Sequence, residues 1–466
     1  MATNEQTKNK PPESEKPDRD EGLEQERIQQ VIEAVDAENV EELNELLEPL
    51  HAADVADLIE QISAPERSAL LELWGEEIDG EVLSELDDAI REPLIESLPS
   101  EVLAEAVRDL DSDDVVDLVE DLQAEQQSRI LAVLEDADRF TVEAALSFPE
   151  YSAGRLMQRE LVAVPEDWSV GQAIDYIRNH DDLPDQFYHV ILVSPMMKPV
   201  GYVALGRVLS ARRDGAMMDL IEISFRTLKV TDPESDVAYQ FNHYHLISAP
   251  VVDEVGRLVG VITIDDAMGV LDEEHEEDML RMAGIDEDSS LGDSVLKTTR
   301  GRAVWLMVNL LTAILASLVI NLYAETINQM VALAVLMPIV ASMGGNAGTQ
   351  SMTVAVRAIA TRELTARNAL RVSWREVIVG AINGFSFGLI MAVVAGFWFG
   401  IPMLGLVIAL AMLLTLIAAA LGGIVIPMTL ERMKIDPALA SGPFVTTITD
   451  VVGFFAFLGL ASMLLL

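Results

Sequence analysis

Five long apolar stretches in the C-terminal part of the chain constrain its fold more than any other feature. They cover residues 304–322, 331–355, 377–399, 403–427 and 443–465, and each has at least nineteen residues. That is about the length that an α-helix needs to cross the ~30 Å hydrocarbon core of a bilayer. We therefore expect an α-helical membrane domain, residues 299–466, with five transmembrane helices.

The basic residues around these stretches predict the orientation of the domain. They precede the first stretch, lie between the second and third, and lie between the fourth and fifth: Lys297, Arg300, Arg302; Arg357, Arg362, Arg367, Arg371, Arg375; Arg432, Lys434. The two remaining loops contain no basic residue. Loops rich in Lys and Arg stay on the cytoplasmic side. We expect a multi-pass protein of the inner (cytoplasmic) membrane with cytoplasmic N-terminal domains and the C-terminus outside.

The last apolar stretch contains one ionisable side chain, Asp450. It follows Ser441 by nine residues, which is about 14 Å along a helix and near the middle of the hydrocarbon layer. A carboxylate there costs at least a few kcal/mol unless it faces water, a partner or a cation. A cation path is the favoured interpretation. The alternative is a protonated acid that donates a hydrogen bond between packed helices.

The residues before the membrane domain are very acidic. Residues 1–296 contain 21 basic and 71 acidic residues, a net charge of −50, whereas the rest of the chain has a net charge of +4. Binding of hard cations and adaptation to high salt both explain such acidity. Seven lysines against 24 arginines favour salt adaptation for most of the surplus. The charge argues against nucleic acid as a partner, and the absence of cysteine excludes disulfides and zinc thiolate sites.

The N-terminal region is expected to be helical after a polar tail. Residues 1–21 contain no signal-peptide pattern and are expected to be disordered. In residues 22–150, one amphipathic helix from Gln25 to about Leu47 precedes a repeat with a large apolar residue every twelve positions, from Leu50 to Leu134. Short amphipathic helices must stack to bury their apolar faces. We expect an all-α superhelical N-domain, with an irregular helical bundle as the alternative.

Residues 151–271 repeat one order of strands and helices, at about residues 156–216 and 224–271. The segment APVVDEVGRLVGVITIDD, residues 249–266, resembles a cystathionine-β-synthase (CBS) domain, so we expect an α+β tandem CBS pair. CBS pairs usually bind adenosyl ligands or cations, which makes an adenine nucleotide such as ATP an expected ligand. Thr263 to Asp266, at the end of the second copy, would contact the ribose; the alternative is that these strand-end acids bind no ligand.

A cluster of acidic residues follows, at the start of an expected connecting helix, residues 272–298. Four of them share one helix face: Glu273, Glu274, Glu277 and Asp278. Like charges three and four positions apart destabilise a helix unless cations or basic partners neutralise them. We interpret the cluster as a cation sensor, with a solvated acidic face of a salt-adapted protein as the alternative.

The second apolar stretch contains Pro338 and the segment MGGNAGTQS, residues 343–351. Consecutive glycines with small polar residues predict an interrupted membrane helix, because freed backbone groups need water or protein partners. Unwound backbone at this depth suits a cation route. The alternative is a glycine-rich face for close helix packing.

Three segments resemble the MgtE family of magnesium channels and transporters: MPIVASMGGNAGTQS, RAIATREL and DPALASGPFVTTITDVVG. The resemblance covers about residues 22–466 and implies a homodimer in a lipid bilayer, with Mg²⁺ both transported and regulatory. It implies that the ion pathway is lined by Asp450, Thr446, Thr447, Asn346, Gly348, Thr349 and Thr353. It also implies metal binding by Asp450 in the pore and by Asp266, Glu274, Glu277 and Asp278 in the cytosol. Thr349 and Gly442 stand where some members have Asn, and Gly269 stands where some carry an acid.

The predicted function is therefore Mg²⁺-selective uptake that cytosolic Mg²⁺ closes through the acidic N-domain, CBS and connecting-helix sites. The alternatives are a transporter of Mn²⁺ or Co²⁺, a cation-exchanging carrier, and a membrane-tethered CBS sensor that conducts nothing. The last of these leaves Asp450 unexplained. The sequence contains no nucleophile–base set, P-loop or metal-hydrolase motif, so we do not expect an enzyme.

Overall fold

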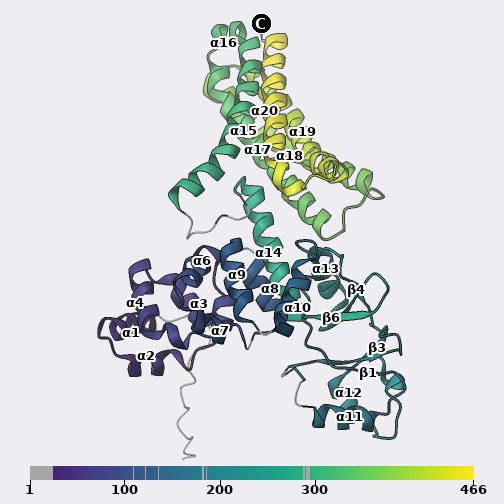
Figure 1. The fold of residues 1–466 in the computed structure, drawn as a ribbon. Coiled ribbons are helices and arrows are strands. Elements are labelled where there is room, and N and C mark those ends of the chain that lie inside the picture. Colours follow the sequence, from purple (N-terminus) through teal and green to yellow (C-terminus); the bar gives the residue numbers. More distant parts are fainter. Residues whose placement is uncertain are drawn as a thin grey trace, which may run out of the picture. The chain divides into compact units, whose positions relative to one another are not determined.

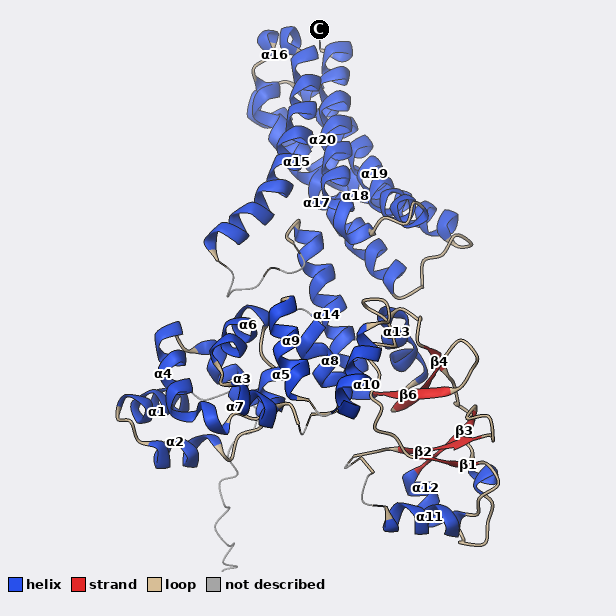
Figure 2. Ribbon diagram, in the orientation of Figure 1, coloured by secondary structure: helices blue, strands red, loops and turns tan. Residues whose placement is uncertain are grey.

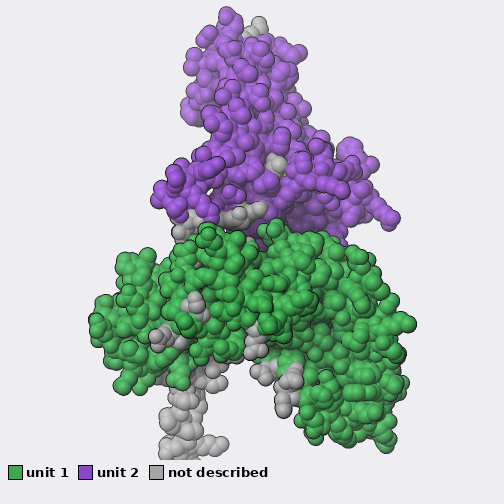
Figure 3. All heavy atoms as spheres, in the orientation of Figure 1, with its two compact units in different colours: residues 1–237, 246–264 green, residues 238–245, 265–466 purple. Residues whose placement is uncertain are grey.

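The computed structural model describes residues 25–108, 110–120, 122–134, 136–180, 183–184, 186–286, 289 and 294–465. The predicted disordered tail, residues 1–21, lies outside them. The chain divides into two compact units (Figure 3). The first comprises residues 1–237 and 246–264, and the second comprises residues 238–245 and 265–466.

The first unit begins with a stack of short helices (Figure 1). They are α1 (Gln25–Asp36), α2 (Val40–Leu47), α3 (Ala52–Gln61), α4 (Ala64–Trp74), the 3-10 helix η1 (Gly75–Glu77), α5 (Gly80–Ser84), α6 (Asp88–Ser97), α7 (Ser100–Ala106), α8 (Ser112–Glu120), α9 (Ala124–Val133) and α10 (Asp136–Leu146). Repeat residues such as Ile62, Trp74 and Leu98 are buried in one shared core. This confirms the predicted all-α stack.

The single amphipathic helix predicted from Gln25 to Leu47 is wrong. The chain breaks between α1 and α2, where Glu38 has a φ of 49° and the Asn39 side chain accepts a hydrogen bond from the backbone N–H of Glu42. An Asn side chain that caps a new helix competes with continuation of the old one. The apolar periodicity continues across this break and hides it in the sequence.

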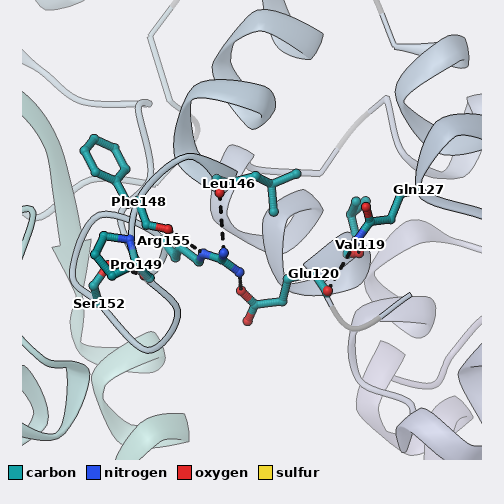
Figure 4. A network of polar contacts seen from close by, with 8 residues as sticks. All are labelled: Val119, Glu120, Gln127, Leu146, Phe148, Pro149, Ser152 and Arg155. Atoms are coloured by element: carbon teal, nitrogen blue, oxygen red, sulfur yellow. Dashed lines mark hydrogen bonds and ion pairs between the residues drawn. The ribbon is translucent and has the colours of Figure 1, made fainter. Parts of the chain in front are cut away.

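Arg155 ties the helical stack to the segment that follows it (Figure 4). Its guanidinium forms a 2.8 Å ion pair with Glu120, at the end of α8. It also donates to the backbone carbonyl oxygens of Phe148 (3.1 Å) and Leu146 (3.4 Å), at and just beyond the end of α10. The Arg155 side chain is only 15% exposed and that of Glu120 only 25%, so solvent screens this pair weakly.

Arg155→Ala is expected to cost about 2–3 kcal/mol of local stability, because it removes a mostly buried charge partner and two hydrogen bonds from one junction. Hydrogen exchange followed by mass spectrometry should show faster exchange in α8 and α10. Arg139→Ala is the matched control, because Arg139 pairs with an Asp136 side chain that is 95% exposed, and such pairs contribute under about 1 kcal/mol. Equal effects of the two substitutions would contradict this account.

Two small sheets of identical topology form the next part of the chain. The first copy contains β1 (Ala163–Pro165), α11 (Val170–Asn179), β2 (His189–Val193), β3 (Pro199–Ala204), α12 (Leu205–Ser210) and η2 (Met217–Leu220); the second contains β4 (Leu228–Lys229), α13 (Glu234–Tyr244), β5 (Ser248–Val252), β6 (Leu258–Thr263) and α14 (Ile264–Ala283). In each copy the middle strand pairs parallel with the first strand and antiparallel with the third. Buried His189 in β2 bonds to Ser248 in β5 at 2.7 Å, which joins the copies. The predicted α+β repeat is confirmed.

The acidic connecting helix differs from its prediction. The helix expected at the end of the CBS pair and the one expected at residues 272–298 form a single helix, α14, which begins at Ile264. It ends at Ala283 and is followed by Gly284 with a φ of 71°, a conformation that glycine adopts readily at a helix end. Part of the predicted remainder lies outside the described residues, and the next helix begins at Val295.

The membrane domain contains five helices that are long and apolar enough to cross a bilayer, as predicted (Figure 2). They are α15 (Val295–Leu322), α17 (Ala332–Ala360), α18 (Ala369–Phe399), α19 (Pro402–Arg432) and α20 (Pro437–Leu464), with the short helix α16 (Ala324–Gln329) between the first two. α19 is the most buried of the five and packs against α17, α18 and α20.

The predicted interruption of the second membrane helix is wrong. α17 runs without a break through Pro338 and residues 343–351. Its glycines serve packing: a Cβ built on Gly344 would lie 2.7 Å from Cγ2 of Thr415, and one on Gly348 would lie 2.7 Å from Cγ1 of Val445. Real Cβ atoms essentially never approach this closely. The small residues therefore let α17 lie close to α19 and α20, which is the packing alternative.

Candidate functional site

Asp450 lies in the interior of α20 and is partly buried. Within the described part of the chain, its carboxylate has no hydrogen-bond or ion-pair partner, whereas the neighbouring Thr449 is fully buried and bonds to the backbone oxygen of Thr446. A helix-packing hydrogen bond within one copy therefore does not explain this acid. A carboxylate at this depth needs water, a cation or a second copy beside it.

The other predicted pathway residues fall into two groups. Asn346, Thr349 and Thr353 on α17 and Thr446 on α20 are exposed in the single chain. Polar side chains in hydrocarbon lack partners, so these faces require water or protein against them. Gly348 is buried against Val445 and Thr449, so the structure gives it a packing role. The Thr447 hydroxyl donates to the backbone oxygen of Pro443 at 2.6 Å, which leaves its lone pairs as acceptors.

Gly344→Val is expected to reduce the yield of folded protein, because backbone and side chains of α19 and α20 fill the space that the new side chain needs. Overpacking of this kind costs about 1–3 kcal/mol or more. Gly345→Val is the matched control, since nothing lies within 4 Å of a Cβ at Gly345. Size-exclusion profiles and thermal midpoints in detergent check the difference. Equal losses in both variants would show that helix propensity, rather than packing at Gly344, limits stability.

A second polar cluster joins α14 to the start of α20. Arg281 forms ion pairs with Glu277 on its own helix (2.9 Å) and with Asp436 (3.1 Å). Asp436 caps α20 by accepting a hydrogen bond from the backbone N–H of Ala438. Met282, the next residue on α14, packs against a core that contains Ala438 and Val445. One end of the acidic helix thus rests on the helix that carries Asp450.

Burial raises the pKa of Glu274, and the neighbouring carboxylates of Asp278 and Asp436 raise it further. Burial and Asp436 likewise raise the pKa of Asp278. Arg281 opposes both shifts without cancelling them. These carboxyl groups are therefore harder to ionise where they are packed than they would be in water. A nearby cation would favour their ionised form.

Sequence analysis did not identify Asp436 as a member of this cluster. The signal was an Asp–Pro pair at the start of a membrane helix, which is also typical of an ordinary helix cap.

Asp266 lies in the first turn of α14, and Gly269 is exposed with open space around it. Among the described residues, no group of three or more His, Asp or Glu is placed to hold a metal ion. The predicted sensing residues are therefore not assembled into a metal centre here.

Comparison with known proteins identifies the family. The family model described as MgtE, divalent cation transporter, matches residues 337–460; the MgtE intracellular N domain matches residues 50–151; and the CBS domain matches residues 153–214 and 219–273. The magnesium transporter MgtE of Thermus thermophilus is 31% identical over 341 residues, which cover 72% of this chain and 75% of the relative. The chain belongs to the MgtE family. This confirms the resemblance noted in the sequence.

Other MgtE proteins give the same result. The magnesium transporter MgtE of Enterococcus faecalis is 31% identical over 69% of this chain and 71% of its own. Among solved structures, the cytosolic domain of the Mg²⁺ channel MgtE in complex with ATP is 27% identical, with a TM-score of 0.48, and covers 52% of this chain and 99% of that one. MgtE proteins are transporters, so the prediction that the chain is not an enzyme is confirmed.

Proposed function

We propose that this MgtE protein mediates Mg²⁺ uptake across the cytoplasmic membrane, with Asp450 on the ion path. The observation that carries the proposal is an acid inside a membrane helix with no partner in the described part of its own chain. The relatives named as magnesium transporters support the choice of ion. The chemistry agrees, because Mg²⁺ takes oxygen ligands and is held by one or two carboxylates while it keeps several waters.

We further propose that the functional unit is a homodimer in the bilayer. In one copy, the polar faces of α17 and α20 that contain Asn346, Thr349 and Thr446 are exposed. A second copy against them would enclose a wet path and place two Asp450 carboxylates across it. A pair of carboxylates can attract a hydrated divalent cation while leaving its inner water shell in place, which favours passage over permanent binding.

Cytosolic Mg²⁺ would close this path through α14. Mg²⁺ that screens Glu274, Asp278 and Asp436 would weaken their mutual repulsion and hold α14 against the start of α20. We place Asp266 and Glu277 in the same regulatory set. Because the Mg²⁺-bound arrangement is favoured only where the carboxylates are close, Mg²⁺ shifts the population toward it. The loop charges support a cytoplasmic location for the N-domain (residues 22–150) and the CBS pair (residues 151–271).

An adenine nucleotide at the CBS pair is part of the same proposal. The support is the solved cytosolic domain of an MgtE Mg²⁺ channel in complex with ATP. The proposed ribose contacts are Thr263 to Asp266, where β6 ends and α14 begins.

The test is Mg²⁺ influx into proteoliposomes that contain the purified full chain and an internal Mg²⁺ indicator. We expect influx when the face that carries the soluble domains is Mg²⁺-poor, and little influx when that face holds millimolar Mg²⁺. Mn²⁺ and Co²⁺ are supplied separately as the transported ion. Influx of either in preference to Mg²⁺ would change the proposed substrate, and an absence of flux for all three would contradict the transport proposal.

A further inference from the structure

A groove lined by both polar and apolar residues lies between α17 and α18, with α19 as its floor. It has a volume of about 180 Å³, and its polar lining comes from Gln350 and Ser351 on α17 and from Glu376 and Asn383 on α18, above Leu416 and Ala420 of α19. None of the residues that line it comes from α20. At about 100° per residue, this face of α17 is turned roughly 120° from the face that contains Asn346, Thr349 and Thr353. The groove is therefore separate from the proposed Asp450 path.

Close packing against α19 fixes the two walls of the groove. A Cβ built on Gly380 of α18 would lie 2.7 Å from the backbone oxygen of Leu416. On the other wall, a Cβ built on Gly423 of α19 would lie 2.7 Å from Cβ of Ser351. These contacts bring α17 and α18 near enough for the Ser351 hydroxyl to donate to Oε2 of Glu376 at 3.0 Å. The carboxylate is thus held in a defined position on the groove wall.

The remaining polar groups of the groove require an occupant. Gln350 and Asn383 are exposed side chains, and within the described part of the chain neither amide has a hydrogen-bond partner. Glu376 has a single donor, Ser351, for a group that accepts several hydrogen bonds. The amides of Gln350 and Asn383 lie within two of the apolar stretches, where polar groups without partners cost several kcal/mol. Glu376 lies one residue before the third stretch. The cavity has room for several waters at ~30 Å³ each.

We propose that this groove binds a hydrated Mg²⁺ ion at Glu376, as a second cation site apart from Asp450. The proposal rests on the proposed transport function for the choice of ion. One carboxylate with hydroxyl and amide oxygens around it suits an ion that keeps most of its water shell and accepts few protein ligands. Water that remains on the ion would satisfy the amides of Gln350 and Asn383. The occupant matches the charge of Glu376, the polar residues beside it and the volume of the groove.

The absence of cysteine from the chain allows a direct test with one introduced thiol. Ala347→Cys places a thiol on the groove wall with little change in size. The full chain in lipid nanodiscs is treated with a water-soluble, positively charged methanethiosulfonate reagent, with and without Mg²⁺ at matched ionic strength. We expect modification in Mg²⁺-free buffer, slowed about tenfold when the Mg²⁺ concentration is about ten times the dissociation constant.

Two further substitutions show which carboxylate is responsible for the protection by Mg²⁺. In the Ala347→Cys background, Glu376→Gln should abolish the slowing by Mg²⁺, and Asp450→Asn should leave it intact. Protection that survives Glu376→Gln would show that Mg²⁺ acts through a distant conformational change, which overturns the proposal. Modification that Mg²⁺ never slows would also overturn it. A thiol that never reacts would show that a second copy or lipid covers the groove, which likewise overturns a site for a hydrated ion.

Two single substitutions distinguish cation binding by Glu376 from a purely structural role, in which the hydrogen bond from Ser351 to Glu376 only holds α17 and α18 together. Glu376→Gln keeps an oxygen that accepts from Ser351 but removes the charge, whereas Ser351→Ala removes the hydrogen bond and keeps the charge. Cation binding predicts that only Glu376→Gln abolishes Mg²⁺ protection. If Ser351→Ala abolishes it while Glu376→Gln does not, the pair is only a clamp. Protection in a protein that shows no flux would refute the transport function and leave the cation site standing, so the two failures are distinguishable.

Discussion

Asp450→Asn is expected to reduce Mg²⁺ influx by at least about a hundredfold. The substitution keeps the size of the side chain and removes the charge, and a loss of ~3 kcal/mol in cation stabilisation corresponds to a factor of this size. Because the carboxylate has no partner in the described part of its own chain, removing its charge breaks no ion pair there. We therefore expect the variant to fold, with an unchanged size-exclusion profile and an unchanged or higher thermal midpoint. Proteoliposome influx with the cytosolic face Mg²⁺-poor provides the measurement.

Glu431→Gln is the matched control for this substitution. It also removes one negative charge from a membrane helix, at the exposed end of α19, and should leave influx within about twofold of the unsubstituted protein, as expected for a screened surface charge. Asp450→Glu keeps the charge on a longer side chain and should retain part of the flux. If Asp450→Asn conducts like the unsubstituted protein, the acid is a packing residue and the proposed path is wrong.

Features of the sequence that depend on local chemistry predicted the fold well. Apolar stretches of membrane length gave the five membrane helices, because a bilayer fixes the required length. The twelve-residue spacing of large apolar residues gave the helical stack, because each short helix must bury one face. The duplicated α+β unit was evident from strands and helices that recur in the same order. In each case the physical requirement acts on residues close together in the chain.

The errors arose where contacts between distant segments decide the outcome. Glycines in α17 suggested an unwound helix, yet Gly344 and Gly348 are small because Thr415 and Val445 lie against them. Pairing of Arg281 with Asp436 could not be read from either segment alone. The groove at Glu376 did leave a signal, since Glu376 and Asn383 are seven residues apart and share a helix face. The sequence did not show that Gln350 and Ser351 on α17 lie opposite this face.

For Asp450, the sequence indicated a candidate site but not which groups surround it. Its lone charge in an apolar helix identified it as a candidate site. The sequence left open whether it bonds to a neighbouring helix, and the structure shows no such bond among the described residues. The carboxylates that we propose to be regulatory differ, because their proposed role depends on their burial at a helix contact rather than on their number. Burial and neighbouring carboxylates raise the pKa of Glu274 and Asp278 on α14.

Glu274→Gln combined with Asp278→Asn is expected to raise the cytosolic Mg²⁺ concentration that half-closes the protein by about tenfold or more. Two carboxylates that Mg²⁺ would neutralise are lost, and coupling energies between regulatory and functional sites are typically about 1–3 kcal/mol. The matched control is Asp272→Asn with Glu276→Gln, which removes the same charge from exposed positions of the same helix. Influx measured across a series of cytosolic Mg²⁺ concentrations checks both. Equal shifts would mean that the total charge of α14, and not the buried cluster, senses Mg²⁺.

The raised pKa values also predict a response to pH. Glu274 and Asp278 have a higher pKa where α14 packs on α20 than the ordinary value of about 4, so the packed arrangement binds protons more strongly than the separated one. Protonation therefore stabilises the contact fully below the ordinary pKa, and this stabilisation is lost as the pH rises through the raised pKa. At neutral pH the ionised carboxylates weaken the contact, and in our proposal Mg²⁺ offsets their repulsion. When the cytosolic face contains no Mg²⁺, acidifying it should therefore reduce Mg²⁺ influx, because protons neutralise the carboxylates as Mg²⁺ would. The double variant should lose much of this response. Influx that increases on acidification would show that the contact between α14 and α20 opens the path instead of closing it.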